Sequence, residues 1–393
     1  MTPAARVQTS IELLDTIIEA ARAKGAPADR ILADWFRSNR FAGSKDRRAI
    51  RELVYAAIRA CGTMPASGRA AMLRLAHTDD TIAPLFDGST YGPRTLVAGE
   101  EAAEGGTAPP WLEARLTASG IAGEEAEALL DRAPLDLRVN TLKADRATIT
   151  LPVEAEPTCA PHGLRLAAGT QVEQWSESRE GQIEVQDTGS QIACLAVNAR
   201  PGETVIDLCA GGGGKTLALA AAMDNVGRLI ASDTDRGRLS RLAPRAERAG
   251  ATNIETRLLD PKREFEALGD LEGQADAVMI DAPCSGTGTW RRNPEARWRL
   301  DEAELARLTA LQSALLDLGA RLVRPGGRLI YVTCSLLDEE GAGQFAGFIQ
   351  RNAAFQRVEL TLPAGRLRGN GIRLTPYHDD TDGFFIACAT RPC

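Results

Sequence analysis

The feature that most constrains this chain is an alternation of short apolar runs with helical patterns, which begins at residue 186. Strands that alternate with helices form a parallel sheet covered on both faces. The apolar runs are TVIDL (204–208), RLIAS (228–232), IETRLL (254–259), AVMID (277–281) and RLIYVTC (328–334). The helical patterns are 189–199, 215–222, 235–249 and 301–323. We therefore expect a doubly wound, mostly parallel α/β domain over residues 176–393.

The residues before this domain show a different pattern. Apolar side chains in the first part of the chain recur at helical spacing, and Thr9–Ser10 could cap the first helix. Further on, 137–142 and 163–166 are candidate strands within a mixed segment. We expect an all-α domain at 1–105 and a small α+β segment at 106–175.

Composition narrows the class of protein but not its function. The net charge of the 393 residues is −7, so nucleic acid would have to bind a local basic patch rather than the whole surface. There are eight cysteines without a CxxC pair and only three histidines, which argues against a zinc site. The sequence has no apolar run long enough for a membrane span and no secretory signal at its N-terminus. We expect a cytoplasmic monomer with free thiols, no metal and no membrane contact.

The run DLCAGGGGKT at 207–216 lies between the first strand of the α/β domain and the next helix. Glycines at such a point let the backbone approach a ligand closely. A dinucleotide fingerprint would need glycine where Thr216 stands. A Walker A loop would need glycine where Cys209 stands, although Gly214, Lys215 and Thr216 match its second half. The loop alone leaves several cofactors open.

Acidic residues at the ends of the strands favour one of these cofactors. Asp207, Asp233, Asp260 and Asp281 follow the first four strands in turn. Ligands of open α/β sheets bind outside the carboxyl ends of the strands. A carboxylate after the second strand could bind ribose hydroxyls, and one after the third could bind the adenine amino group. The acids would repel a triphosphate, so we expect S-adenosylmethionine rather than a nucleoside triphosphate.

Two cysteines stand at the ends of neighbouring strands. Cys284 follows Asp281-Ala-Pro, and Cys334 lies between Thr333 and Ser335. Carbon 5 of cytosine becomes nucleophilic when a thiolate adds to carbon 6, and a nearby acid can bind the edge of the base. In methyltransferase-type sheets the fourth and fifth strands are neighbours, so both thiols and Asp281 would face one pocket. The pattern predicts cytosine methylation, with either cysteine as the nucleophile.

A basic segment comes directly after Cys284. It carries Trp290, Arg291, Arg292, Arg297, Trp298 and Arg299. Arginines interleaved with aromatic residues suit contacts with phosphates and stacked bases. We expect Arg291, Arg292, Arg297 and Arg299 to contact RNA.

Several segments make the chain similar to the RNA cytosine-5 methyltransferase family of the Sun/Fmu group. They are VQDTGSQIA (185–193), DLCAGGGGKT, DAPCSGTGTWRRNPEARWR, LVRPGGRLIYVTCS and DGFF (382–385). The segment PLDLRVNTLKADR (134–146) resembles the small RNA-binding extension of this family. The run SKDRRAIRELVYAAIR resembles, more loosely, the NusB-like helical domain of bacterial small-subunit ribosomal RNA methyltransferases. The resemblance implies a Rossmann-like methyltransferase domain preceded by an all-α NusB-like region and a small α+β segment.

The family also implies roles for individual residues. Cys334 would be the catalytic nucleophile, Cys284 would assist product release, and Asp281 would join them in catalysis. Contacts with the cofactor would come from Cys209, Ala210, Gly211, Gly212, Gly213, Gly214, Lys215, Asp233, Asp260 and Asp281. The family usually has Ala-Pro where this chain has Gly211-Gly212, so we expect a more flexible loop here.

The resemblance leaves the substrate open. The NusB-like region favours 16S ribosomal RNA as the methylated partner, and transfer RNA is the alternative. A P-loop-like NTPase and a non-catalytic RNA-binding assembly factor are alternatives from other classes. Intact Cys284 and Cys334 argue against the assembly factor.

Overall fold

A computed structural model describes residues 1–393, and the chain folds into two separate units within it. The first unit contains Met1–Asp131 and Thr289–Asp301, and the second contains Arg132–Gly288 and Glu302–Cys393. These units do not coincide with the expected boundaries at residues 105 and 175. The helices of the expected α+β segment fold with the first unit, whereas its strands fold with the second.

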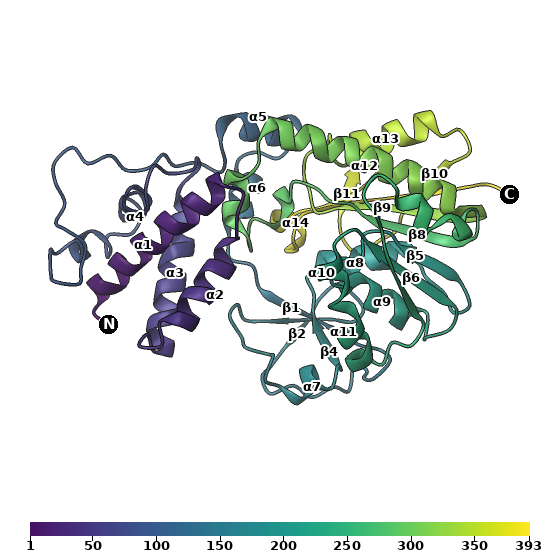
Figure 1. The fold of residues 1–393 in the computed structure, drawn as a ribbon, viewed down its shortest axis with the longest axis horizontal. Helices are drawn as coiled ribbons and strands as arrows, with labels where there is room; N and C mark the ends of the chain where they lie inside the picture. Colours follow the sequence, from purple (N-terminus) through teal and green to yellow (C-terminus); the bar gives the residue numbers. More distant parts are fainter. The chain divides into compact units, whose positions relative to one another are not determined.

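The first unit is helical, as the apolar spacing predicts (Figure 1). Its helices are α1 (Pro3–Arg22), α2 (Ala28–Ser38), α3 (Ser44–Ala60), α4 (Gly68–Ala76), α5 (Pro110–Ala118) and α6 (Glu124–Glu127). The first helix begins earlier than expected, because Thr2 caps it by accepting a hydrogen bond from the Ala5 amide. Ser10 is buried inside α1 and donates to the Arg6 carbonyl at 2.8 Å. The predicted Thr9–Ser10 cap is therefore wrong.

A distant piece of sequence completes this helical unit. Residues 289–301 contribute the 3₁₀ turn η6 (Pro294–Trp298), and Trp298 belongs to the same hydrophobic core as the helices. The buried Glu295 accepts a hydrogen bond from the Ala28 amide at 2.9 Å, at the start of α2. Residues 289–301, which follow Cys284 in the sequence, therefore fold as part of the first unit.

The second unit contains two sheets. The smaller sheet has the antiparallel order β2-β3-β1-β4. Its strands are β1 (Leu135–Val139), β2 (Glu156–Pro157), β3 (Gly163–Leu166) and β4 (Ile183–Val185), with the short helix α7 (Ser176–Arg179) before β4. The candidate strands at 137–142 and 163–166 correspond to β1 and β3.

The larger sheet has nine strands in the order β11-β12-β13-β9-β8-β5-β6-β7, with β10 paired to β13. The five strands expected from the apolar runs are β5 (Thr204–Asp207), β6 (Arg228–Asp233), β7 (Ile254–Leu258), β8 (Ala275–Asp281) and β9 (Val323–Thr333). They pair in parallel, and β8 lies beside β9. The expected Rossmann-like arrangement, with its fourth and fifth strands adjacent, is confirmed.

Helices cover both faces of this sheet (Figure 1). They are α8 (Thr188–Val197), α9 (Gly214–Ala222), α10 (Arg236–Leu239), α11 (Leu242–Ala249), α12 (Glu302–Leu322) and α13 (Ala342–Arg351). Along β8, Ala277 and Met279 belong to the core with α8, α9 and α11, whereas Val278 and Ile280 belong to the core with α12 and α13. The helix expected over 235–249 is split into two, because Pro244 in the first turn of α11 has no amide for the helical hydrogen bond.

The C-terminal part of the sheet is antiparallel. It consists of β10 (Gln356–Val358), β11 (Arg366–Arg368), β12 (Gly371–Leu374) and β13 (Phe384–Thr390), with helix α14 (Pro376–Asp379) between the last two. The strand β13 pairs with β9, with Phe385 opposite Thr333. The DGFF segment is therefore brought beside the strand that leads to Cys334. None of the helices combines the length and hydropathy that a membrane-spanning helix requires.

Candidate active site

The parallel strands end at one edge of the large sheet, and the predicted site residues gather there. Asp207, Asp233 and Asp281 are the last residues of β5, β6 and β8. Cys334 follows β9 directly, and Asp260 comes shortly after β7. The sheet topology thus brings together residues that are far apart in the sequence.

The glycine loop is held in a fixed shape between β5 and α9. Gly211 and Gly213 have φ angles of 55° and 84°, a region that favours glycine. A Cβ atom on Gly213 would come within 2.2 Å of the Leu242 side chain, so no larger residue fits there without rearrangement. The Gly211 amide donates to Asp233 Oδ2 at 2.8 Å, and the Asp235 amide donates to Asp233 Oδ1 at 2.7 Å. The carboxylate of Asp233 therefore orders the loop.

Asp207 is fully buried beneath this loop. Thr216 donates to Asp207 Oδ2 at 2.6 Å, whereas Oδ1 is buried without a hydrogen-bond partner. Burial raises the pKa of Asp207 to about 7, and the negative charge of Asp281 acts in the same direction. Asp207 therefore ties the end of β5 to the start of α9 rather than facing the solvent-exposed edge.

Lys215 and Asp281 form the main ion pair of the site. Lys215 Nζ lies 2.7 Å from Asp281 Oδ2 and 5.5 Å from the centre of the Phe384 ring. Burial disfavours the lysine charge, but the Asp281 carboxylate more than offsets burial and raises the pKa of Lys215. Asp260 is different, because its side chain is 66% exposed and pairs only with Arg263, at 3.5 Å.

The two predicted catalytic cysteines are in contact. The Sγ atoms of Cys284 and Cys334 are 3.3 Å apart, and both residues are partly exposed. The adjacency of β8 and β9, with Asp281 opposite Val332, explains this contact. The hydrogen bond with Cys334, followed by burial and the nearby charge of Glu340, raises the pKa of Cys284 well above its usual value. Either sulfur can donate a hydrogen bond to the other across this contact.

Sequence reasoning missed a buried carboxylate that joins the two cysteine loops. Glu340 is fully buried, and its Oε1 accepts hydrogen bonds from the Ser285 amide at 2.9 Å and from Gln312 at 3.0 Å. Its Oε2 accepts a short hydrogen bond from the Ser285 hydroxyl. Ser285 Oγ lies 3.2 Å from Ser335 Oγ, which follows Cys334. Glu340 comes after two other acids, and no signal in the sequence distinguished it from them.

The four arginines predicted to contact RNA have mainly structural partners. Arg291 and Arg297 are buried, with exposed fractions of 4% and 0%. Arg297 donates to the carbonyls of Ile58 and Cys61 at 2.8 and 2.7 Å, where α3 ends. The prediction is therefore wrong for Arg297, whose fully buried guanidinium is bound to these carbonyls, whereas an RNA contact of Arg291 stays a prediction.

The other two arginines of the segment are partly exposed. Arg299 donates to the carbonyls of Gly25 and Ala26 at 2.9 and 2.8 Å, just beyond α1. Its guanidinium is therefore already engaged in a structural role. An RNA contact of Arg292 stays a prediction.

No cluster of three or more His, Cys, Asp or Glu side chains is arranged to hold a metal ion. The donor set at the sheet edge instead suits an uncharged or cationic nucleoside. Carboxylates can accept hydrogen bonds from ribose hydroxyls and an amino group, and the loop backbone allows close approach. The same carboxylates would repel a triphosphate.

Comparison with known proteins agrees with this geometry. Residues 194–389 match the family model described as 16S rRNA methyltransferase RsmB/F. The probable ribosomal RNA small subunit methyltransferase B of Synechocystis sp. is 37% identical over 270 residues, which are 64% of this chain and 59% of that relative. The chain thus spans about three fifths of the length of this relative.

Two solved structures are also similar. The crystal structure of PH0851 has a TM-score of 0.79 at 26% identity and covers 99% of both chains. A methyltransferase homolog protein from Pyrococcus horikoshii has a TM-score of 0.60 at 26% identity, covering 72% of this chain and 100% of the other. The first of these comparisons includes the helical unit as well as the large sheet.

Proposed function

We propose that this chain, whose residues 194–389 match the RsmB/F methyltransferase family, transfers a methyl group from S-adenosylmethionine to carbon 5 of a cytosine in RNA. The observation that carries the proposal is the cysteine pair. Two thiols 3.3 Å apart lie at the ends of adjacent parallel strands, in the same sheet edge as the Lys215–Asp281 ion pair. Cytosine methylation requires a reactive thiol beside a cofactor pocket, and this edge offers both.

In the proposed reaction, the thiolate of Cys334 adds to carbon 6 of the cytosine. Carbon 5 would thereby become nucleophilic and take the methyl group of the S-adenosylmethionine sulfonium, whose sulfur–methyl bond breaks to leave S-adenosylhomocysteine. A base, which can be a water molecule, would then take the proton from carbon 5. The electron pair of that bond re-forms the double bond between carbons 5 and 6, the bond between sulfur and carbon 6 breaks, and the Cys334 thiolate is restored. Asp281, which is partly exposed and held by Lys215, would bind the edge of the base.

The contact between the two thiols supports different roles for them. At a distance of 3.3 Å, a protonated Cys284 can stabilise a thiolate on Cys334 by donating a hydrogen bond. It can also assist the later elimination. Cys334 is thus the proposed nucleophile, and Cys284 the group that promotes product release.

The proposed cofactor site is the edge between the glycine loop and β7. Backbone groups of Cys209–Lys215 would contact the cofactor, with Asp233 directed to the ribose and Asp260 to the adenine. Asp233 already accepts two backbone hydrogen bonds, so its carboxylate is oriented before the cofactor binds. Asp260 is open to solvent and free to reorient.

The proposed substrate is 16S ribosomal RNA, which is supported by the substrates of the matched family and of the relative, a 16S rRNA methyltransferase family and a ribosomal RNA small subunit methyltransferase. The test uses purified full-length protein, methyl-labelled cofactor and separate transcripts of 16S ribosomal RNA and transfer RNA. We expect label in the ribosomal transcript, located at 5-methylcytosine by bisulfite sequencing. Label only in transfer RNA would change the substrate, and label in neither RNA would overturn the proposed activity.

Nucleotide binding separates this proposal from the NTPase alternative. We expect calorimetry to show binding of S-adenosylmethionine and of its demethylated product, but no binding of ATP with magnesium. Cys209 in place of the Walker glycine and the acids at the strand ends are the reasons. Tight binding of ATP without binding of S-adenosylmethionine would favour the NTPase.

A further inference from the structure

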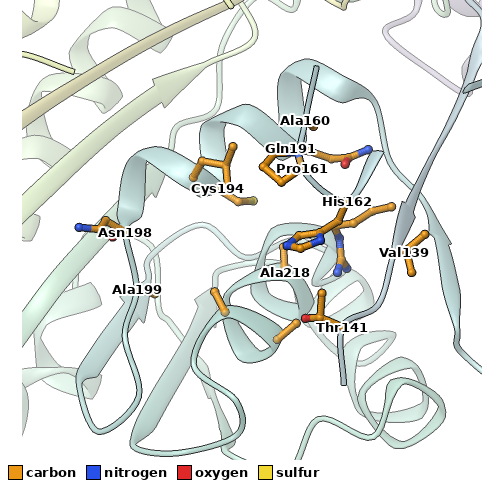
Figure 2. A pocket seen from close by; sticks show the side chains of 14 residues that line it. Val139, Thr141, Ala160, Pro161, His162, Gln191, Cys194, Asn198, Ala199 and Ala218 are labelled. Carbon is orange, nitrogen blue, oxygen red and sulfur yellow. The ribbon is translucent and has the colours of Figure 1, made fainter. Parts of the chain in front are cut away.

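A second cleft lies in the second unit, away from the cysteine pair. It has a volume of about 200 Å³, and its walls are formed by residues of β1, of the loop before β3, of α8 and of the C-terminal half of α9. Figure 2 shows Gln191 and Cys194 of α8, Ala218 of α9 and the ring of His162 around this space. The glycine loop contacts the opposite end of α9, so this cleft is not the proposed cofactor site.

A buried guanidinium in this cleft lacks a counter-ion. Arg138 is only 5% exposed, and its one hydrogen bond joins Nε to Gln186 Oε1 at 2.7 Å. It forms no ion pair, and the remaining nitrogens of the guanidinium have no protein partner. Keeping a charge out of water without a partner is costly, so native proteins rarely do it without a ligand or an ion pair.

The nearest acid does not neutralise this charge. Glu184 lies opposite Arg138 in the β1–β4 pair, but its carboxylate oxygens bind Arg245 and Arg248. Three arginines therefore surround one carboxylate. The same cleft is also bordered by Gln191, whose Oε1 is buried without a hydrogen-bond donor. The cleft therefore lacks a negative charge to pair with Arg138 and a hydrogen-bond donor for Gln191 Oε1.

The rest of the lining suits a flat, partly apolar group. Ala160, Leu195, Ala199 and Ala218 provide an apolar wall, and His162 is an exposed aromatic ring at the rim. A nucleotide would supply the negative charge and the hydrogen-bond donor that this cleft lacks, and its base would fit the apolar wall. It carries a negative phosphate, hydroxyl or amino donors, and a flat base that can stack on an aromatic ring.

We propose that this cleft binds a nucleotide of the substrate RNA outside the reaction centre, with its phosphate on Arg138 and its base against His162. This inference rests on the proposed function for the identity of the RNA, although the anion site itself does not. The cleft would hold the RNA at a second point while the target cytosine reacts at the cysteine pair. It would thus contribute to RNA affinity rather than to chemistry.

The test compares Arg138→Met with wild-type protein in binding a 16S ribosomal RNA transcript. We expect about tenfold weaker binding and a salt dependence reduced by about one counterion. Methyl transfer at saturating RNA should be unchanged. Because the variant removes an unpaired buried charge, its melting temperature should not fall. The control is Arg321→Met, which removes an exposed arginine of α12 that pairs with Glu272, and it should leave RNA binding unchanged.

A second variant guards against a folding defect in Arg138→Met. Ala221→Trp fills the cleft from the surface of α9 and leaves Arg138 in place. It should also weaken binding of the transcript. If both variants bind the transcript as wild type does, and cytidine 5′-monophosphate does not bind the wild-type protein at millimolar concentration, the proposal is wrong.

Cytidine 5′-monophosphate distinguishes a free nucleotide from RNA as the source of the phosphate. Binding to wild type and not to Arg138→Met, with unchanged transcript binding, would support the anion site and assign it to a free nucleotide. If the wild-type protein methylates no RNA at all, the proposed function fails. Binding of cytidine 5′-monophosphate to wild type, compared with Arg138→Met, still decides whether the anion site exists.

Discussion

At the scale of single residues, the two cysteines have different expected phenotypes although their sulfur atoms touch. Cys334→Ala should abolish both methyl transfer and the covalent adduct with RNA, because it removes the attacking thiolate. Cys284→Ala should still attack and transfer the methyl group but should fail to release the product. Denaturing gels of each variant, incubated with RNA and S-adenosylmethionine, should show a slow band for Cys284→Ala only.

The outcome of this experiment can also reverse the assignment. A slow band for Cys334→Ala and none for Cys284→Ala would make Cys284 the nucleophile. If neither variant forms a band, methyl transfer proceeds without a stable adduct, and the assignment of a release step to Cys284 loses its basis.

A second prediction at this scale concerns Asp207, whose pKa burial raises to about 7. In the unfolded chain this carboxyl titrates near its usual value of 3.8. Between these values the folded protein holds a proton that the unfolded chain has released, so this contribution to stability is lost as the pH rises toward 7. From pH 5 to 8 the loss should be roughly 2–3 kcal/mol.

Asp207→Asn should remove this part of the pH dependence, because an amide does not titrate. The measurement is the free energy of unfolding of variant and wild type by denaturant at several pH values. The difference should shift in favour of the variant as the pH rises. Asp224→Asn, at an exposed position, is the control. A constant difference across this pH range would mean that Asp207 titrates normally.

At the scale of elements, Glu340 links the loops after β8 and β9. Glu340→Gln keeps an oxygen for the Ser285 amide but loses the acceptor for the Ser285 hydroxyl. A small shift of either loop separates the thiols, so we expect turnover to fall roughly 10- to 100-fold. Cofactor affinity should be unchanged, because the glycine loop makes no contact with this network.

The measurement is kcat together with the Kd for the cofactor, and a melting curve shows whether the variant is folded. Glu339→Gln is a matched control, because its side chain is adjacent in the sequence but partly exposed. Wild-type turnover of a folded Glu340→Gln would show that the hydrogen bonds of Glu340 do not position the cysteines.

The elements also show what the sequence could and could not predict. The five parallel strands were predictable because four of them are apolar runs buried in the sheet, and the fifth, the exposed edge strand β7, continues the same strand–helix rhythm. The adjacency of β8 and β9 brought Cys284 to Cys334 as expected. The C-terminal strands β10–β13 were not predicted, because short antiparallel strands give no strand–helix rhythm. Glu340 was missed for another reason. Burial of a polar side chain depends on tertiary contacts, here with Gln312 of α12, and leaves no local pattern.

At the scale of the whole molecule, the arginine segment was misinterpreted because composition does not reveal which unit a segment joins. Residues 289–301 follow Cys284 in the sequence but fold with the helices of Met1–Asp131. Their buried arginine satisfies carbonyls at the end of a helix, a need that is visible only when the fold is known. The chain thus enters the helical unit twice, with the residues of the second unit between.

The last prediction follows from this arrangement. Arg297 is fully buried and donates to the carbonyls of Ile58 and Cys61, and burial lowers its pKa to about 10, so it is still charged at neutral pH. Arg297→Met would leave the Cys61 carbonyl without a donor and the Ile58 carbonyl with only the Cys61 amide, and should destabilise the helical unit by about 2–4 kcal/mol. In Arg297→Met, hydrogen exchange should increase along α3, while the strands β5–β9 keep their protection. The control is Arg48→Met, on the exposed face of α3, which should leave the exchange of both α3 and these strands unchanged. Unchanged protection of α3 would show that the helical unit does not depend on residues 289–301. If Arg297→Met also loses RNA binding, the loss should accompany the increased hydrogen exchange of α3, because the fully buried guanidinium itself cannot reach a phosphate.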